Sequence, residues 1–252
     1  MRGRASLFAV CALLAAAAGA AAQAPNPPPA WDIHFGASFV GTSGNSHTST
    51  VGGDFAYRYR GAAWQLDSMA TAVRTSDTGA LEAEQYVAGF RSRRKLKDGI
   101  GFSSGLRAER DRLSGIALRT ILDGGLSYAF VETDDWSVDA LTSLAWNREQ
   151  RLVGPNRSDP VGTLQVLSRV SLGSSGTTTE RVTLYPDLQE ASAYRGEAEM
   201  TAEAAMNSWL ALKIGYLLRY SNSPVPGFRR TDNTTTASVL LHWRAPGGSR
   251  QP

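Results

Sequence analysis

The stretch LALKIGYLLRY, residues 210–220, alternates in residue type from one position to the next. A two-residue period is typical of a β-strand with one apolar and one polar face. Similar runs of about ten residues, the length a tilted membrane strand needs, recur between turn residues from Trp31 to Trp243. The pattern predicts an all-β chain of about twelve strands. The apolar face of the quoted run consists of Leu210, Leu212, Ile214, Tyr216, Leu218 and Tyr220.

The length of these runs favours a membrane-spanning barrel over a soluble β-sandwich, which is the alternative for an alternating sequence of this size. Aromatic residues lie at the ends of the runs, where a membrane barrel carries its aromatic girdles. No later segment is apolar for long enough to cross a bilayer as a helix, and only helices and closed barrels satisfy every backbone group in lipid. We therefore predict a transmembrane antiparallel up-and-down β-barrel in a bacterial outer membrane.

The first residues have the composition of an export signal. Arg2 and Arg4 precede an apolar stretch, and small alanines offer a cleavage site before Gln23. We expect a signal peptide over 1–22, a Pro/Ala-rich linker over 23–30, the barrel over 31–244 and a polar tail over 245–252. Cleavage removes the only cysteine and lowers the net charge from +3 to +1, so neither disulfides nor nucleic acid binding are expected.

The connections between runs predict the orientation. Those after even-numbered runs are tight turns, whereas those after odd-numbered runs include the long polar segments Arg148–Pro160 and Ser221–Asp232. Bacterial barrels have short periplasmic turns and longer outside loops. Both ends of the chain are therefore predicted to lie in the periplasm. The ninth run, Thr179–Tyr185, is the least regular, because it is short and Pro186 follows it.

Three short motifs carry a family resemblance: Gly41–Ser46 (GTSGNS), Tyr194–Glu197 (YRGE), and the Pro-rich stretch from Tyr220 to Asp232. With these motifs, the sequence resembles the salt-induced outer-membrane proteins of the YdiY-like type over Trp31–Arg244. The resemblance implies an outer-membrane barrel associated with envelope stress. It also implies outer-membrane lipids and the barrel-assembly machinery as partners, and it brings neither a catalytic motif nor a defined substrate.

The polar faces of the runs place charges of both signs in the predicted lumen. Mixed signs in a narrow barrel indicate either ion pairs that fill the interior or a polar conduit for small solutes, whereas a strongly selective pore needs a ring of one sign. Both interpretations stay open. The candidate lumen charges are Asp54, Arg58, Arg107, Glu109, Arg195, Glu197, Glu199 and Lys213.

Closure of the barrel predicts a second group. The last strand must pair antiparallel with the first, which brings His242 and Arg244 close to Asp32 and His34. We expect Asp32 to bond Arg244, with either histidine sharing that contact. The cluster is interpreted as a clasp that closes the barrel, or as a gate that loosens when the histidines gain charge near pH 6.

Other chemistry finds little support in the sequence. The three histidines, His34, His47 and His242, are dispersed and show no metal-ligand spacing, so we expect no metal, cofactor or catalytic residue. The favoured function is a small, envelope-supporting outer-membrane barrel of the stress-associated type, and whether its lumen is open to small solutes is left undecided. The alternatives are a barrel that binds or adheres through its outside loops and, less favoured, a membrane-embedded hydrolase.

Overall fold

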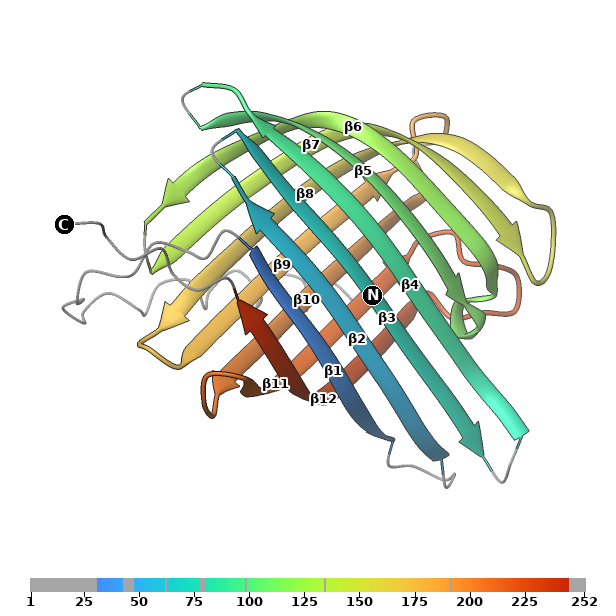
Figure 1. The fold of residues 1–252 in the computed structure, drawn as a ribbon. Helices are drawn as coiled ribbons and strands as arrows, with labels where there is room; N and C mark the ends of the chain where they lie inside the picture. Colours follow the sequence, from blue (N-terminus) through green and yellow to red (C-terminus); the bar gives the residue numbers. More distant parts are fainter. Residues whose placement is uncertain are drawn as a thin grey trace, which may run out of the picture.

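The computed structural model describes residues 31–42, 48–61, 63–77, 80–97, 99–133, 135–190 and 192–244. They form a closed barrel of twelve strands, each paired antiparallel with its sequence neighbours, and a short 3-10 helix, η2 (Arg112–Ser114), between the fifth and sixth strands (Figure 1). The strands are β1 (Trp31–Thr42), β2 (Thr48–Arg60), β3 (Trp64–Asp77), β4 (Ala80–Lys95), β5 (Ile100–Asp111), β6 (Ile116–Glu132), β7 (Trp136–Arg151), β8 (Arg157–Leu172), β9 (Gly176–Pro186), β10 (Tyr194–Ala205), β11 (Leu210–Ser221) and β12 (Thr231–Arg244).

The barrel closes between its first and last strands. The register sets Phe35 opposite Leu241 and His34 opposite His242, and Figure 1 shows the blue β1 beside the red β12. Because this pair is antiparallel, the start of β1 and the end of β12 lie at the same end of the barrel. We call this the terminal end. The opposite end, which carries η2 and the connections 187–193 and 222–230, we call the loop end.

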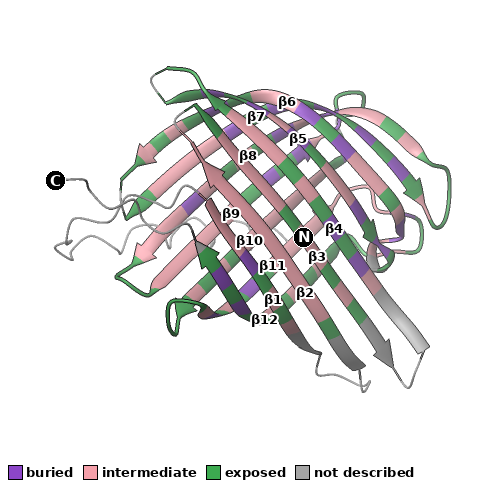
Figure 2. Cartoon of the chain, in the orientation of Figure 1, coloured by how far each residue is buried: buried purple, intermediate pink, exposed green. Residues whose placement is uncertain are grey.

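The alternation of residue types corresponds to the two faces of the wall. On β7, Ser143 and Ala145 face inward and are buried, whereas Leu144 and Trp146 face outward and are 70% and 53% exposed. Buried and exposed positions also alternate along much of β5, whereas β10 is mostly intermediate in exposure (Figure 2). A buried apolar cluster of Ile121, Ala145, Val161 and Tyr185 lies inside the barrel rather than between layers. No helix among the described residues is long and apolar enough to cross a membrane.

The outer surface is apolar around the whole ring. Large side chains that a soluble protein would bury are exposed on it, which leaves lipid as their partner. A closed ring of this kind has no free edge and satisfies its backbone groups within the wall, as a membrane requires. The protein is an outer-membrane β-barrel, as the sequence predicts. The exposed residues include Phe90, Phe102, Leu122, Phe130, Leu144, Val166, Met200, Ile214, Val239 and Trp243.

Two sequence-based predictions of strand bounds are wrong. The segment Arg148–Pro160 is not a long loop, because β7 continues to Arg151 and β8 already begins at Arg157. The ninth strand is also longer than predicted: β9 pairs with both neighbours over most of its length, and Pro186 is its last residue. As a result, short and long connections alternate less clearly than the sequence suggested.

The predicted export signal, linker and tail, over 1–22, 23–30 and 245–252, lie outside the described residues. They stay predictions, as does the assignment of the terminal end to the periplasm.

Candidate functional site

Charged side chains on the inner wall converge in the loop half of the barrel. Glu109 on β5 accepts a 3.1 Å bond from Arg107 Nε and a short bond from Arg119 on β6. Glu149 on β7 accepts from Arg119 Nη2 at 2.6 Å and from Arg151 Nε at 2.5 Å. Both carboxylates are almost fully buried. Each buried charge therefore has partners of opposite sign, which is the condition for keeping it ionised away from water.

Two further contacts cross the lumen. Arg107 Nη1 on β5 donates to Glu197 Oε2 on β10 over 3.3 Å, and Arg219 Nη1 on β11 donates to Asp111 Oδ2 on β5 over 3.0 Å. β5 and β11 stand opposite each other in the ring of strands. These side chains therefore narrow the barrel from one wall to the other. We call the set Arg107, Glu109, Asp111, Arg119, Glu149, Glu197 and Arg219 the constriction.

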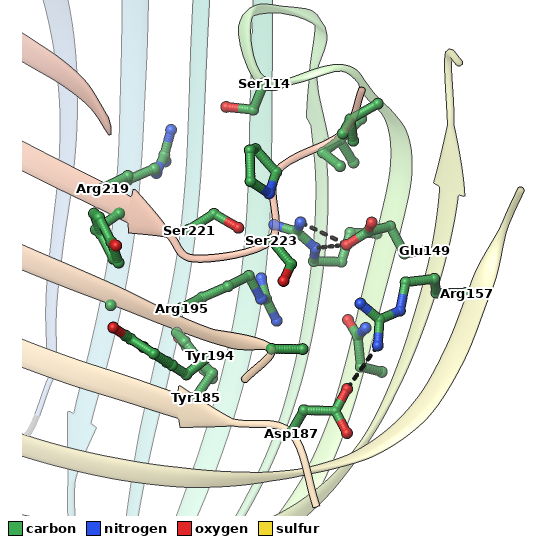
Figure 3. A pocket seen from close by; sticks show the side chains of 18 of the residues that line it. Ser114, Glu149, Arg157, Tyr185, Asp187, Tyr194, Arg195, Arg219, Ser221 and Ser223 are labelled. Carbon is green, nitrogen blue, oxygen red and sulfur yellow. Dashed lines mark hydrogen bonds and ion pairs between the residues drawn. The ribbon is translucent and has the colours of Figure 1, made fainter. Parts of the chain in front are cut away.

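A hollow that opens to solvent lies in the loop half beside the constriction, and we call it the vestibule (Figure 3). Seven arginines and five acidic residues line it, among them several of the constriction. Several of these charges are paired: Arg157 donates to Asp159 at 3.0 Å and to Asp187 at 2.9 Å. The lining includes Val225 and Pro224 from the connection 222–230, so this connection forms part of the wall.

Arg195 differs from the paired arginines. Its guanidinium carbon lies 5.0 Å from the centre of the Tyr185 ring, which is a cation–π arrangement. Its Nη2 atom is buried and has no hydrogen-bond partner. In Figure 3 the Arg195 side chain lies between the Tyr185 ring and Glu149. A buried donor without an acceptor is costly, so this atom marks a place where an added acceptor would be stabilised.

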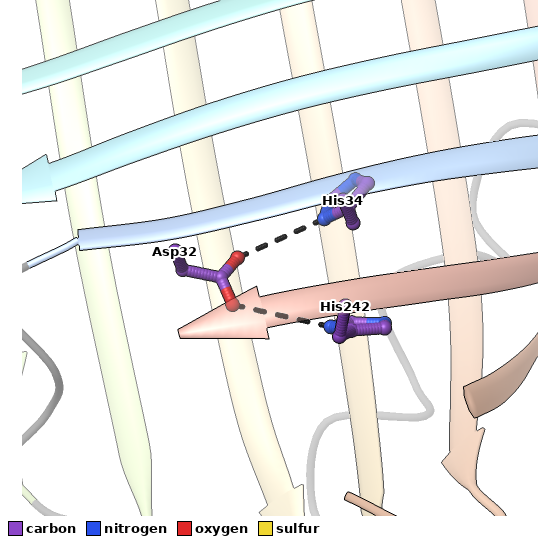
Figure 4. A group of neighbouring side chains, drawn as sticks. All are labelled: Asp32, His34 and His242. Carbon is purple, nitrogen blue, oxygen red and sulfur yellow. Dashed lines mark ion pairs between the residues drawn. The ribbon is translucent and has the colours of Figure 1, made fainter. Parts of the chain in front are cut away.

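The seam between β1 and β12 carries the second predicted group. Asp32 Oδ1 lies 3.7 Å from His34 Nδ1, and Asp32 Oδ2 lies 3.9 Å from His242 Nδ1 (Figure 4). The two imidazole rings are 5.4 Å apart. On its other side, His242 Nε2 lies 3.3 Å from Glu203 Oε1 on β10. The backbone of Arg244 pairs with Asp32, but the Arg244 side chain, and with it the predicted bond, lies outside the described part.

These contacts bear on the two interpretations of the seam. Asp32 lies beside both histidines, so the cluster connects β1 and β12 through side chains as well as through the backbone. The clasp and the gate both stay predictions.

Comparison with known proteins identifies the family. Residues 35–243 match the family model described as "Protein of unknown function, DUF481". The chain belongs to the DUF481 family. No curated protein matches it.

Several solved barrels are similar in fold. The NanC porin is 17% identical, with 86% of this chain and 100% of that chain covered and a TM-score of 0.48. The COG4313 outer membrane channel from Pseudomonas putida F1 is 12% identical, with 87% and 97% covered and a TM-score of 0.49. The KdgM porin in complex with disordered oligogalacturonate is 10% identical, with 85% and 99% covered and a TM-score of 0.46.

The DUF481 barrel distributes the eight candidate lumen charges over several places. Arg107, Glu109 and Glu197 belong to the constriction, and Arg195 lies in the vestibule. The others lie nearer the terminal end. Lys213 Nζ donates to Asp54 Oδ2 at 3.1 Å, Arg181 Nη1 donates to Glu199 Oε2 at 2.6 Å, and Arg58 has no ion pair within 4.0 Å among the described residues.

One glycine makes room for the Lys213–Asp54 pair. A Cβ atom at Gly36 would lie 2.6 Å from an Asp54 carboxylate oxygen, so this carboxylate sits directly over the glycine backbone. A side chain at this position would therefore require the Asp54 carboxylate to move.

Asp111, Glu149 and Tyr185 are among the members of the DUF481 site that sequence reasoning missed. The sequence pattern places Glu149 in a loop. However, Glu149 lies two residues after Asn147 and four after Ala145, so continuing the alternation of inward positions along β7 predicts that it faces the lumen. Tyr185 is an aromatic residue on the inner wall, only 7% exposed, and the polar pattern alone gives no signal for it.

Proposed function

We propose that this DUF481 barrel is a narrow conduit for small polar solutes across the outer membrane, with a preference for anions. The observation that carries the proposal is Arg195, whose buried Nη2 has no acceptor in the vestibule. A solute carboxylate or phosphate would supply the missing acceptor. Charge-assisted hydrogen bonds of this kind are stronger than neutral ones, and the planar guanidinium suits both groups.

The charge balance of the vestibule supports the same preference. Its seven arginines exceed its five acidic residues, and several of those acids already accept bonds from other arginines. The net positive charge would concentrate anions at the loop end before they reach the constriction. Because the lining is mixed in sign, we expect a moderate preference rather than strict exclusion of cations.

The constriction sets the expected size limit. Arg107 and Glu197 are hydrogen-bonded across the lumen. A passing solute must therefore fit beside this pair or replace one of its contacts. An anion can replace a carboxylate as the partner of an arginine, so an anion that leaves Arg195 can take the place of Glu197 at Arg107. This mechanism fits a narrow conduit with low conductance.

Planar bilayer recording tests the proposal. The purified barrel should carry current, and its reversal potential in a KCl gradient should indicate preference for chloride. Citrate should block this current. In Arg195→Gln the blocking concentration should rise about tenfold, which corresponds to about 1.4 kcal/mol and to the loss of one charge-assisted bond. Lys95→Gln is the matched control, because it removes one positive charge from an exposed pair with Glu132.

Each outcome has a defined meaning. A folded barrel that carries no current would contradict the conduit, and citrate binding without current would favour the loop-mediated binding protein instead. Preference for potassium, or equal citrate block in both variants, would contradict the role of Arg195. The hydrolase has no comparable support, since His34 and His242 face the lumen rather than lipid. The link to salt or other envelope stress stays a prediction.

A further inference from the structure

The seam contains three metal-ligand groups in one place. Ligand atoms of Asp32, His34 and His242 all lie within 4.8 Å of one another. Two of them come from β1 and one from β12, so only closure of the barrel assembles the group (Figure 4). A tetrahedral zinc ion with bonds of about 2.0–2.1 Å separates neighbouring ligand atoms by about 3.4 Å. The observed 3.7 and 3.9 Å between Asp32 and the histidines are close to that spacing.

The histidine nitrogens point to a missing partner. His34 and His242 are only 5% and 7% exposed, yet Nδ1 of each has no hydrogen-bond partner. Buried polar nitrogens are normally satisfied, so two unsatisfied ones directed at the same carboxylate call for an explanation. A cation bound between them would accept both lone pairs and the carboxylate charge together.

Glu203 completes the arrangement from a third strand. Its carboxylate lies 3.3 Å from Nε2 of His242, the ring nitrogen on the side away from Asp32. Histidines that bind a metal through one nitrogen usually donate the other N–H to a carboxylate, which fixes the tautomer and strengthens the ligand. Glu203 stands where that second carboxylate belongs if Nδ1 holds the metal.

We propose that the seam binds one zinc-class divalent cation through Asp32, His34 and His242, with Glu203 orienting His242. Two imidazoles and one carboxylate form a ligand set that zinc accepts, and a water from the lumen supplies the fourth position. The ion cross-links the first and last strands, and therefore stabilises the one strand pair that must form between the two ends of the chain. This site is independent of the proposed conduit and uses none of its residues.

The test uses protein purified in detergent from the outer membrane of expressing cells, alkylated so that Cys11 cannot contribute a thiolate. Isothermal titration with ZnCl₂ should show one ion bound per chain, and Co²⁺ should give the visible absorption of a four-coordinate site that Zn²⁺ then displaces. Saturating zinc should raise the temperature at which the folded band is lost on unboiled gels, since a ligand that binds only the folded state stabilises it.

Variants locate the ion. His34→Gln and His242→Gln should each lose zinc binding, and Glu203→Gln should weaken it about tenfold. His47→Gln should bind as the parent does and controls for the third histidine of the chain. Absence of binding to the parent protein, a weak six-coordinate Co²⁺ spectrum, or equal affinity in the His34, His242 and His47 variants would overturn the proposal. The Co²⁺ spectrum of the parent decides the question even if a seam variant does not fold.

Discussion

Replacement of Glu149 by glutamine tests whether the constriction holds the barrel together. The change preserves the size of the side chain but removes the charge that Arg119 and Arg151 share at 2.6 and 2.5 Å. All three side chains are at most 11% exposed, so water cannot readily replace the lost partner. Removing one member of a buried ion pair costs about 3–5 kcal/mol. Because Arg119 retains Glu109, we expect a loss of about 3 kcal/mol, or about a hundredfold in the unfolding equilibrium.

The matched control is Glu132→Gln, which breaks an ion pair whose members are 45% and 66% exposed. Exposed pairs contribute about 0–1 kcal/mol, so this variant should unfold almost as the parent does. Reversible urea titration in lipid vesicles, followed by tryptophan fluorescence, measures both variants. Equal losses would show that water enters the constriction freely and that its ion pairs behave as surface pairs. This result would refute the assignment of a structural role to Glu149.

Three further predictions concern the wall of the barrel. Met200→Arg, on the lipid face, should lower the free energy of unfolding in urea titration by about 2–4 kcal/mol, whereas Thr201→Arg, on the inner face, should lower it by less than about 1 kcal/mol. Similar losses in the two variants would mean that the faces are assigned wrongly. A tag inserted at Gly154 should be labelled on intact cells and one at Ser174 should not, and the opposite result would invert the orientation. Gly125→Ala should lower the yield of folded barrel on unboiled gels, because its Cβ would collide with backbone atoms of the neighbouring strand; a parental yield would show that the strands separate easily there.

The wall of the barrel could be predicted from the sequence because lipid imposes one rule on every strand. Outward positions such as Leu144 must be apolar wherever they cross the membrane, so alternation alone identifies strand and face. The rule ends where the strand leaves the lipid. Beyond Trp146 both faces of β7 are polar, with Arg148 outside and Glu149 inside, and the alternation disappears although the strand continues. The sequence from Arg148 onward therefore has the pattern of a loop.

The contacts across the lumen could not be predicted in the same way. They depend on which strands lie opposite each other in the ring and on how far along the barrel axis each side chain lies. The residue types at neighbouring positions in the sequence indicate neither. Arg219 and Asp111 meet only because β11 and β5 face each other in a ring of twelve. The seam is the exception. Closure fixes the pairing of β1 with β12, so the proximity of His34 and His242 follows from the register. Whether their ring nitrogens find partners depends on the orientation of the side chains, which the register does not determine.

The two proposed sites lie towards opposite ends of the barrel. In the loop half, contacts across the lumen join strands that are distant in the ring, and they must leave room for a solute or exchange with it. At the terminal end, the seam joins neighbouring strands along the wall, and a cation held there would strengthen the wall without blocking the lumen. Because the sites share no residue, their effects should add, as they do for independent positions. Loss of zinc binding can therefore be separated from loss of conduction, and neither result decides the other.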